Sequence, residues 1–395
     1  MTKIKKTLIV ETLSDGHRKE YIEHLFDYIN TGTEAKNNYI FFLNEKLIAD
    51  IDISCDNLQI IPLKKKYFAK KPLYRNLVYY FLIRKILVSY PEIQRVLFLN
   101  FDIYQPMLCI SFFTGRKLEY TGILFQPFHQ IPIESIKSYF RVTIKKVLMN
   151  VLLFMNTNIS KIFILNDESG ADFLNKNLRS SKKHIFSYLP DPIDTRITLD
   201  DDNKINIYEK FGADKNRKIL LVFGNIDFRK NIFNIIDALT QLSEDIQASV
   251  CLLVTGQIHL SNSFQLFDKI KKTNDDYPQL QIILKEGRTT DFEREELFSG
   301  CDVVLMPYLK FYGSSGVLGH AVKYKKPVIA SDTRLMKLMI EKYQLGVCVK
   351  SDNSSEIKNG ILALINQPAT LSRSSKNNEF ISSHRPSEFS KILLN

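Results

Sequence analysis

The sequence predicts an α/β protein made of two Rossmann-like halves. Its 395 residues are about twice the number that one hydrophobic core usually organises. In each half, short β-rich runs alternate with longer helical patterns, which is typical of a parallel, doubly wound sheet. Between the halves, residues Leu189 to Asp194 contain two prolines, which stop a helix or a central strand.

These observations set the expected domains. We expect a first domain over residues 1–190, a second over residues 191–375, and a C-terminal helix over residues 376–395 that packs back on the first domain. Open parallel sheets bind ligands beyond the carboxyl ends of their strands. Two such domains that face each other would form a cleft, and we expect the function to lie there.

The expected elements mostly follow the order strand, then helix. In the first half they are Thr7 to Glu11, Arg18 to Tyr28, Tyr39 to Leu43, Leu58 to Pro62, Leu73 to Ser89, Arg95 to Asn100, Gly122 to Phe125, Glu134 to Met155, Lys161 to Leu165 and Ser169 to Asn177. In the second half they are Lys218 to Phe223, Lys230 to Leu242, Ser249 to Thr255, Phe264 to Lys272, Gln281 to Lys285, Asp291 to Ser299, Asp302 to Pro307, Gly316 to Tyr324 and Pro327 to Ala330.

Composition and local patterns exclude several classes of protein. The five cysteines are scattered and never form a Cys-x-x-Cys pair, which argues against a disulfide framework or a zinc site. The first apolar run, Leu8 to Val10, is too short for a signal peptide, and no window reaches the length of a membrane-spanning helix. We therefore expect a cytoplasmic protein.

The positive charge lies mainly in the first half. Residues 1–195 hold 27 lysines and arginines against 19 acidic residues, whereas residues 196–395 hold 27 against 24. Residues 61–95 carry nine basic groups and one acid, interleaved with tyrosine and phenylalanine. Such a segment suits an anionic surface, either acidic lipid headgroups or a nucleic-acid backbone. The alternative is a solvated basic face over an aromatic core.

The segment Leu221 to Asn231 indicates anion binding. An apolar strand ends at Gly224, and after a short turn Arg229 and Lys230 open the expected helix. Cations are unfavourable at a helix N-terminus unless an anion lies beside them. The alternative is two exposed side chains that bend toward solvent.

A second segment, Pro307 to Ala321, follows the expected strand Asp302 to Met306. Its small residues, Gly313 to Gly316, leave backbone N–H groups uncovered at the start of a helix, an arrangement that can bind a diphosphate. Taken alone this signal is weak, because Gly-Ser-Ser-Gly is also an ordinary loop.

Taken together, five elements of the second half resemble the nucleotide-sugar domain of retaining GT-B glycosyltransferases of the family 4, or group 1, type. They are the strand-Gly-x-x-x-x-x-Lys element, Lys285-Glu286-Gly287-Arg288, the strand Cys301 to Tyr308, Pro327-Val328-Ile329-Ala330-Ser331 and the linker Leu189 to Asp194. The resemblance implies a GT-B fold and transfer of a sugar from a UDP- or GDP-sugar to a hydroxyl of a glycan or lipid-linked acceptor. It also implies retention of configuration and a place in the synthesis of bacterial surface polysaccharides or glycoconjugates.

The resemblance assigns roles to particular residues. The lysine that matches Lys230 contacts the diphosphate, and the family's arginine would match Asn225, so Arg229 is expected to replace it. The expected catalytic residues are Lys230, Arg229, His17 and Asp102. The expected donor-binding residues are Gly16, Gly224, Asn225, Arg288, Tyr312, Gly313, Ser314, Ser315, Gly316, Val317, Leu318 and His320. No metal and no cofactor is implied.

One departure from the family is clear. Its Glu-x7-Glu signature falls on Tyr312 and His320, so both carboxylates are absent. A neutral histidine can accept a hydrogen bond from ribose and a tyrosine hydroxyl can donate or accept one, so we interpret the change as a subfamily feature, with loss of activity as the alternative.

Two residues of the first half have open alternatives. His17 follows the first strand where the family has a glycine-rich loop, and it is either catalytic or an exposed residue at the start of a helix. Asp102 follows the strand Arg95 to Asn100 and either faces the cleft or caps the next helix.

The basic first half fits a lipid-linked acceptor at the inner face of the cytoplasmic membrane. We expect headgroup contacts from residues 61–95 and 137–146, and we expect the apolar rear of the helix Glu134 to Met155 to lie in the core. Two alternatives remain: a basic protein that binds polyanions and has a vestigial donor site, and a GT-B epimerase. No nucleic-acid motif is present, so no nucleic-acid partner is expected.

Overall fold

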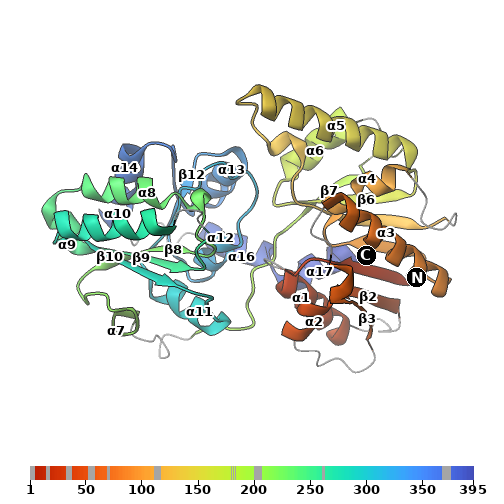
Figure 1. Cartoon of the computed structure of the whole chain (residues 1–395), viewed down its shortest axis with the longest axis horizontal. Coiled ribbons are helices and arrows are strands. Elements are labelled where there is room, and N and C mark those ends of the chain that lie inside the picture. Colours follow the sequence, from red (N-terminus) through yellow and green to blue (C-terminus); the bar gives the residue numbers. More distant parts are fainter. Residues whose placement is uncertain are drawn as a thin grey trace. The chain divides into compact units, whose positions relative to one another are not determined.

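The computed structural model describes residues 5–14, 18–32, 38–51, 58–68, 72–110, 117–178, 180, 182, 184–199, 207–259, 263–366 and 375–395. The chain divides into two compact units (Figure 1). The first comprises Met1–Asp191 together with Pro386–Asn395, and the second comprises Pro192–Arg385. The predicted boundary at residue 190 lies one residue before this division.

The first unit contains a seven-stranded parallel sheet in the order β3-β2-β1-β4-β5-β6-β7. The strands are β1 (Thr7–Glu11), β2 (Tyr39–Asn44), β3 (Gln59–Leu63), β4 (Arg95–Phe98), β5 (Glu119–Leu124), β6 (Ile159–Leu165) and β7 (Phe186–Leu189). The helices are α1 (Arg18–Thr31), α2 (Glu45–Asp50), α3 (Pro72–Ser89), α4 (Gln105–Ile110), α5 (Ile136–Met155), α6 (Glu168–Asn177) and α17 (Pro386–Leu394). The described residues of this unit also form the 3-10 turns η2 (Lys65–Tyr67), η3 (Phe101–Ile103) and η4 (Phe128–Gln130).

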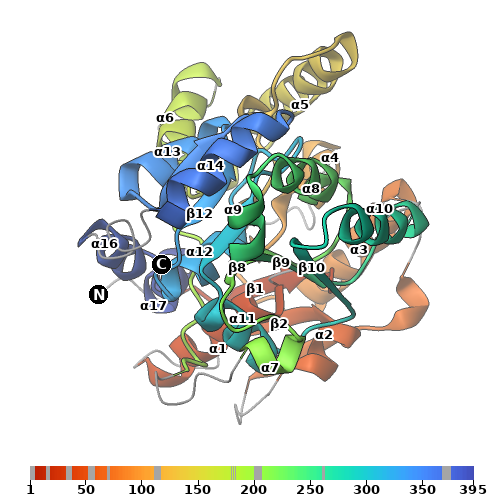
Figure 2. The same cartoon turned by 90° about the vertical axis from the view of Figure 1, so that its left-hand side faces the viewer.

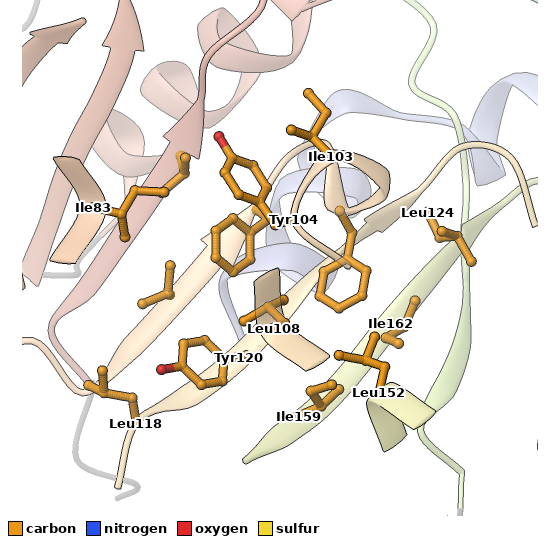
Figure 3. Close-up of a cluster of buried hydrophobic side chains, with 14 of the residues drawn as sticks. Ile83, Ile103, Tyr104, Leu108, Leu118, Tyr120, Leu124, Leu152, Ile159 and Ile162 are labelled. Carbon is orange, nitrogen blue, oxygen red and sulfur yellow. The ribbon is translucent and has the colours of Figure 1, made fainter. Parts of the chain in front are cut away.

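Apolar side chains cover both faces of this sheet. Leu8 and Val10 of β1 join a cluster with α3, α4, α5 and α6, part of which Figure 3 shows around Tyr104, Leu108 and Tyr120. Ile9, between them, points the other way and packs with α1, α2 and α17. Strands buried on two faces read as continuous apolar runs, which is why the sequence predicts them well.

Buried Arg95 fastens the C-terminal helix α17 to the first sheet. Its guanidinium donates to the backbone oxygens of Leu394 at 2.8 Å and Leu393 at 2.6 Å. The single helix expected over residues 376–395 is two helices, because Arg385-Pro386 interrupts it. α16 (Ser375–Ser383) belongs to the second unit and only α17 belongs to the first.

The second unit contains a six-stranded parallel sheet in the order β10-β9-β8-β11-β12-β13. The strands are β8 (Lys218–Phe223), β9 (Val250–Gly256), β10 (Gln281–Glu286), β11 (Val303–Met306), β12 (Val328–Ser331) and β13 (Gly346–Val349). The helices, with the 3-10 turn η6, are α7 (Ile207–Phe211), η6 (Phe228–Lys230), α8 (Ile232–Thr240), α9 (Glu244–Ser249), α10 (Ser263–Asp276), α11 (Asp291–Gly300), α12 (Gly316–Lys323), α13 (Arg334–Tyr343), α14 (Ser354–Asn366) and α16.

Two clusters of buried side chains cover the faces of the second sheet. α8, α10 and α14 pack on one face, and α11, α12 and α13 pack on the other (Figure 2). The predicted α/β fold with two Rossmann-like domains is confirmed. The edge strands β7 and β13 were not predicted, because they are less completely buried than the four-residue strands β4, β11 and β12 inside the sheets. The short helices α2, α4, α7 and α9 and the longer helices α13 and α14 were also missed.

The long helix α5 differs from the prediction. Its rear was expected to be core, but only Met149, Leu152 and Leu153 are buried. Phe154 is 81% exposed, and Val147 is also exposed. Figure 1 shows α5 along the outer edge of the first unit. Within the described residues, the helices are all too short or too polar to cross a membrane.

Candidate functional site

The order of the second sheet places two predicted segments side by side. The chain runs outward from β8 to β9 and β10, then returns to lay β11 on the other side of β8. Such a reversal leaves a crevice at the carboxyl ends of the two strands, where open α/β sheets bind ligands. The loop after β8 carries Gly224 to Asn231, and the loop after β11 carries Pro307 to Ser315. These are the two segments for which the sequence predicts anion binding.

A close approach of two backbones shapes the turn after β8. The Gly224 N–H donates to Thr255 O at 3.0 Å, and Gly224 has a φ of +104°. A Cβ on Gly256 would lie 1.8 Å from Gly224 O, so only glycine fits at the end of β9. Next along the edge, the Gly287 N–H donates to Gly256 O at 3.1 Å. Arg288 follows Gly287 and is exposed just after the end of β10. Because β9 lies between β10 and β8, Arg288 is separated from the turn after β8 by one strand.

The helix after this turn begins later than predicted. It was expected from Lys230, but Phe228–Lys230 form a 3-10 turn and α8 begins at Ile232. Asn231 adopts the left-handed conformation, and its amide donates to Pro307 O at 2.8 Å and Ser351 O at 2.6 Å. The sequence-based prediction of anion binding rests on a lysine in the first turn of a helix, and this premise is wrong for Lys230. Lys230 lies in the loop before α8, and the loop fixes its position.

Lys230 is the most unusual group of this site. Its side chain is buried, with the residue only 9% exposed. Nζ donates to the Tyr308 hydroxyl at 2.8 Å and lies 4.3 Å from the centroid of that ring. Among the described residues, no carboxylate lies within ion-pair distance of it. A buried cation is costly unless an anion compensates it, so this arrangement suits a negatively charged ligand.

Arg229 lies in a different environment from its neighbour. It is exposed, and its guanidinium pairs with Asp227, with Nη2 2.6 Å from Oδ2. Its backbone oxygen accepts a hydrogen bond from Leu309 N at 2.9 Å, which ties the loops after β8 and β11 together. The alternative of two solvent-exposed cations therefore describes Arg229 and not Lys230. Asn225 is exposed in the same turn.

The loop after β11 ends at the N-terminus of α12. Ser315 is the N-cap residue and makes no side-chain capping bond, and Gly313 has open space where a side chain would lie. The N–H of Leu318 donates to Ser315 O at 2.9 Å, so this predicted phosphate-binding amide is engaged within the helix. Gly316 and Val317, half-buried, form the first turn with their N–H groups at the positive end of the helix dipole.

Tyr312 and His320, which stand where the Glu-x7-Glu signature has its two carboxylates, have different surroundings. Tyr312 is half-buried in the loop, whereas His320 is buried in α12 with its ring 5.3 Å from that of Phe298. Nδ1 of His320 lies 3.8 Å from Oε1 of Glu295. A carboxylate is thus present near one of the positions, but it comes from the preceding helix, α11.

Sequence reasoning missed Glu295. Arg294 donates to its Oε1 at 3.1 Å, and Tyr324 donates to its Oε2 at 2.7 Å, as does Lys323. Arg294 also reaches Asp194, 3.4 Å away in the chain segment that enters the second unit. The only available signal was the pair Glu295-Glu296 directly before an apolar Leu-Phe, a pattern that does not reveal burial. The cluster positions α12 beside the candidate donor site.

In the first unit, Asp102 lies in η3 and borders a cavity of about 500 Å³. Its carboxylate accepts a hydrogen bond from Phe125 N at 2.8 Å, which links η3 to the end of β5. Burial raises the pKa of this carboxyl. Gly16 and His17 lie outside the described residues. Lys70 and Lys71 of the basic segment also lie outside them, and Arg95 is buried beneath α17 and does not belong to a basic surface.

Comparison with solved structures defines the architecture as GT-B. Anabaena HepE in complex with UDP superimposes with a TM-score of 0.71 at 14% identity over 98% of both chains. The lipopolysaccharide glycosyltransferase WaaG gives 0.65 at 14% identity over 98% of this chain and 99% of its own. Sucrose-phosphate synthase from Thermosynechococcus elongatus gives 0.67 at 12% identity over 99% and 96%.

The second unit carries the sequence relationship. Residues 203–380 match the family model described as glycosyl transferases group 1. This match includes the loops after β8 and β11, and with them Lys230 and the start of α12. No curated protein is similar enough in sequence to match.

Proposed function

We propose that the protein is a glycosyltransferase that moves a sugar from a nucleoside-diphosphate sugar to a hydroxyl of a glycan or lipid-linked acceptor. The observation that carries the proposal is Lys230, a buried cation at the strand reversal whose hydrogen-bond partner is the uncharged Tyr308 hydroxyl. The group 1 match over the same loops supports it. HepE has been solved with UDP and with UDP-glucose, which supports a uridine donor here.

In this proposal the chain acts on the leaving diphosphate by electrostatics. Lys230 supplies a positive charge close to the phosphates, and the first turn of α12 supplies N–H donors for the distal phosphate. Tyr308 holds the ammonium in place before the ligand arrives. We propose that no metal ion is needed and that Arg229 interacts with the donor from the exposed side of the turn.

We propose retention of configuration, as the resemblance implies, with the acceptor proton passing to the leaving phosphate. This route needs no paired carboxylates, which is consistent with the absence of the Glu-x7-Glu signature. We propose that Tyr312 and His320 take over contacts to the donor sugar and ribose. The anomeric configuration of the product, measured by NMR, tests retention directly.

Nucleotide titration tests the donor site. UDP, GDP and ADP are titrated by calorimetry and thermal shift against the wild type, Lys230→Met and the control Lys271→Met, which removes an exposed lysine from α10. A ligand at 100 times its Kd adds about 2.7 kcal/mol of stability. We expect one nucleotide to bind selectively, Lys230→Met to weaken it at least about tenfold, and Lys271→Met to leave it unchanged. Equal binding by wild type and Lys230→Met would refute the assignment.

We further propose that the protein works at the inner face of the cytoplasmic membrane and touches it through α5. This helix contains four cations and no acidic residue. Its exposed apolar side chains recur at helical spacing, at positions 136, 140, 144, 147, 151 and 154. An apolar stripe beside lysine and arginine is typical of helices that lie in the headgroup region of anionic bilayers.

Vesicle binding tests this contact. The full chain is sedimented with vesicles of phosphatidylglycerol and phosphatidylcholine and with vesicles of phosphatidylcholine alone. We expect binding only to the anionic vesicles and a severalfold loss in Ile144→Ser/Phe154→Ser. The control is Phe264→Ser, because Phe264 is 79% exposed on α10 and matches Phe154 in exposure. Failure to bind anionic vesicles at low salt would refute the proposal.

A further inference from the structure

A cavity of about 500 Å³, with several polar and charged residues in its wall, lies within the first unit. It opens at the carboxyl ends of β1, β4 and β5, and its wall includes Arg18, Arg75, Asn76, Asn100 and Asp102. The first sheet reverses its strand order between β1 and β4, so the cavity occupies the same kind of position as the candidate donor site does in the second sheet.

Three buried polar atoms of this wall have no hydrogen-bond partner among the residues that the structure describes. They are Arg75 Nε, Asn76 Oδ1 and Asn100 Oδ1. Asn100 is only 8% exposed. Buried polar atoms almost always have partners, because leaving one without a hydrogen bond costs about 1–3 kcal/mol. Three such atoms on one cavity indicate a ligand that supplies both acceptors and donors.

The charges of the wall are compensated unequally. Arg18 pairs with buried Glu11, with Nε 3.3 Å from Oε2. Asp102 accepts a hydrogen bond from Phe125 N, and the positive charge of Lys145 acts on it. Arg75 forms no ion pair with any described residue, so its guanidinium is the cation that the cavity leaves uncompensated.

We propose that this cavity binds an acceptor carrying an anionic group, a phosphate or a carboxylate. Arg75 binds that group through its fork of N–H donors, which matches the geometry of an oxyanion. Asn76 and Asn100 accept hydrogen bonds from hydroxyls of the same molecule. The role of this ligand as the acceptor substrate rests on the proposed transferase function, whereas the binding of an anionic, hydroxylated ligand does not.

Three sugars that differ only at C6 test the proposal: glucose 6-phosphate, glucuronic acid and glucose. Each is titrated by calorimetry into Lys230→Met, so that phosphate bound at the donor site does not contribute. We expect at least one anionic sugar to bind about tenfold or more tightly than glucose, with the stronger of the two identifying phosphate or carboxylate as the natural group. Equal affinities, or no binding by any of the three, would overturn the proposal.

Variants of α3 assign the binding to Arg75. Arg75→Gln in the same background is expected to abolish the preference for the charged sugar, and Arg75→Lys to keep part of it. The matched control is Arg84→Gln, because Arg84 is exposed on the same helix away from the cavity. An unchanged preference in Arg75→Gln refutes the assignment. UDP titration of Arg75→Gln with Lys230 intact is expected to match wild type, so failure of the donor site is detected separately.

Discussion

Replacement of Gly256 by alanine should disturb the candidate donor site through one steric contact. The new Cβ would lie 1.8 Å from Gly224 O, whereas real Cβ contacts do not fall below 3.0 Å. The turn after β8 must therefore move by about 1.2 Å, the difference between these distances. Such a shift displaces Gly224 relative to Lys230, whose Nζ lies 3.4 Å from the position of a Cβ on Gly224.

Gly287 provides a matched control for the stability of this variant. Gly287 has a φ of +134°, close to the +146° of Gly256, but a Cβ there meets nothing within 4 Å. Both alanine variants carry backbone strain of about 1–3 kcal/mol. Gly256→Ala carries in addition an overlap cost of about 1–3 kcal/mol. The difference between the two variants isolates the steric contact.

Urea unfolding and UDP titration measure the two effects. We expect Gly256→Ala to be less stable than Gly287→Ala by about 1–3 kcal/mol and to bind UDP at least about tenfold more weakly than wild type. Gly212→Ala is the control for binding, because Gly212 also has positive φ and open space around it but follows α7. Equal stability of the Gly256 and Gly287 variants would refute the steric argument.

Three further predictions concern stability. Arg95→Met removes two charge-assisted hydrogen bonds to α17 and should cost about 3 kcal/mol, with loss of hydrogen-exchange protection in that helix; unchanged protection would contradict this. Burial, opposed by Arg18, raises the pKa of Glu11 to about 7, so between pH 4.5 and 7 the folded state binds more protons than the unfolded state. Wild type should therefore lose stability relative to Glu11→Gln as the pH rises from 4.5 to 7, and parallel pH curves of the two proteins would contradict this. Burial lowers the pKa of His384 to about 4, so wild type should lose stability in the second unit relative to His384→Gln as the pH falls from 6.5 to 4. Urea unfolding measures this loss, and a stability difference that does not change with pH would contradict the prediction.

The fold was largely accessible from the sequence because both sheets are parallel and buried. Strands such as β1 and β8 are continuous apolar runs, and the helices between them show apolar periodicity. The edge strands β7 and β13 escaped prediction because they are only partly buried and their pairing along the sheet edge is a long-range interaction. The helices α13 and α14 also escaped prediction, although both bury apolar residues along one side. The sequence predicted one C-terminal helix, whereas the structure shows two helices, α16 and α17, that belong to different units.

For the site, the sequence alone determined the two loops and their residue types. Lys230, Gly224 and the Gly313 to Gly316 stretch were identified from local patterns, because strand ends and glycine loops are local properties. The tertiary structure decided which cation is buried. Arg229 pairs with Asp227, two residues before it, whereas Lys230 donates to Tyr308, 78 residues further along the chain. The burial of Lys230 therefore depends on a contact that its local sequence does not reveal.

Only the tertiary structure shows the cavity of the first unit and the cluster of hydrogen-bonded side chains around Glu295. Arg75 lies on α3 and Asn100 follows β4, and nothing in their sequence neighbourhoods shows that they border one space. Likewise Glu295 gathers partners from α11 and α12. The physical reason is that burial and charge compensation depend on neighbours brought together by packing, whereas the sequence determines propensity, periodicity and turn chemistry.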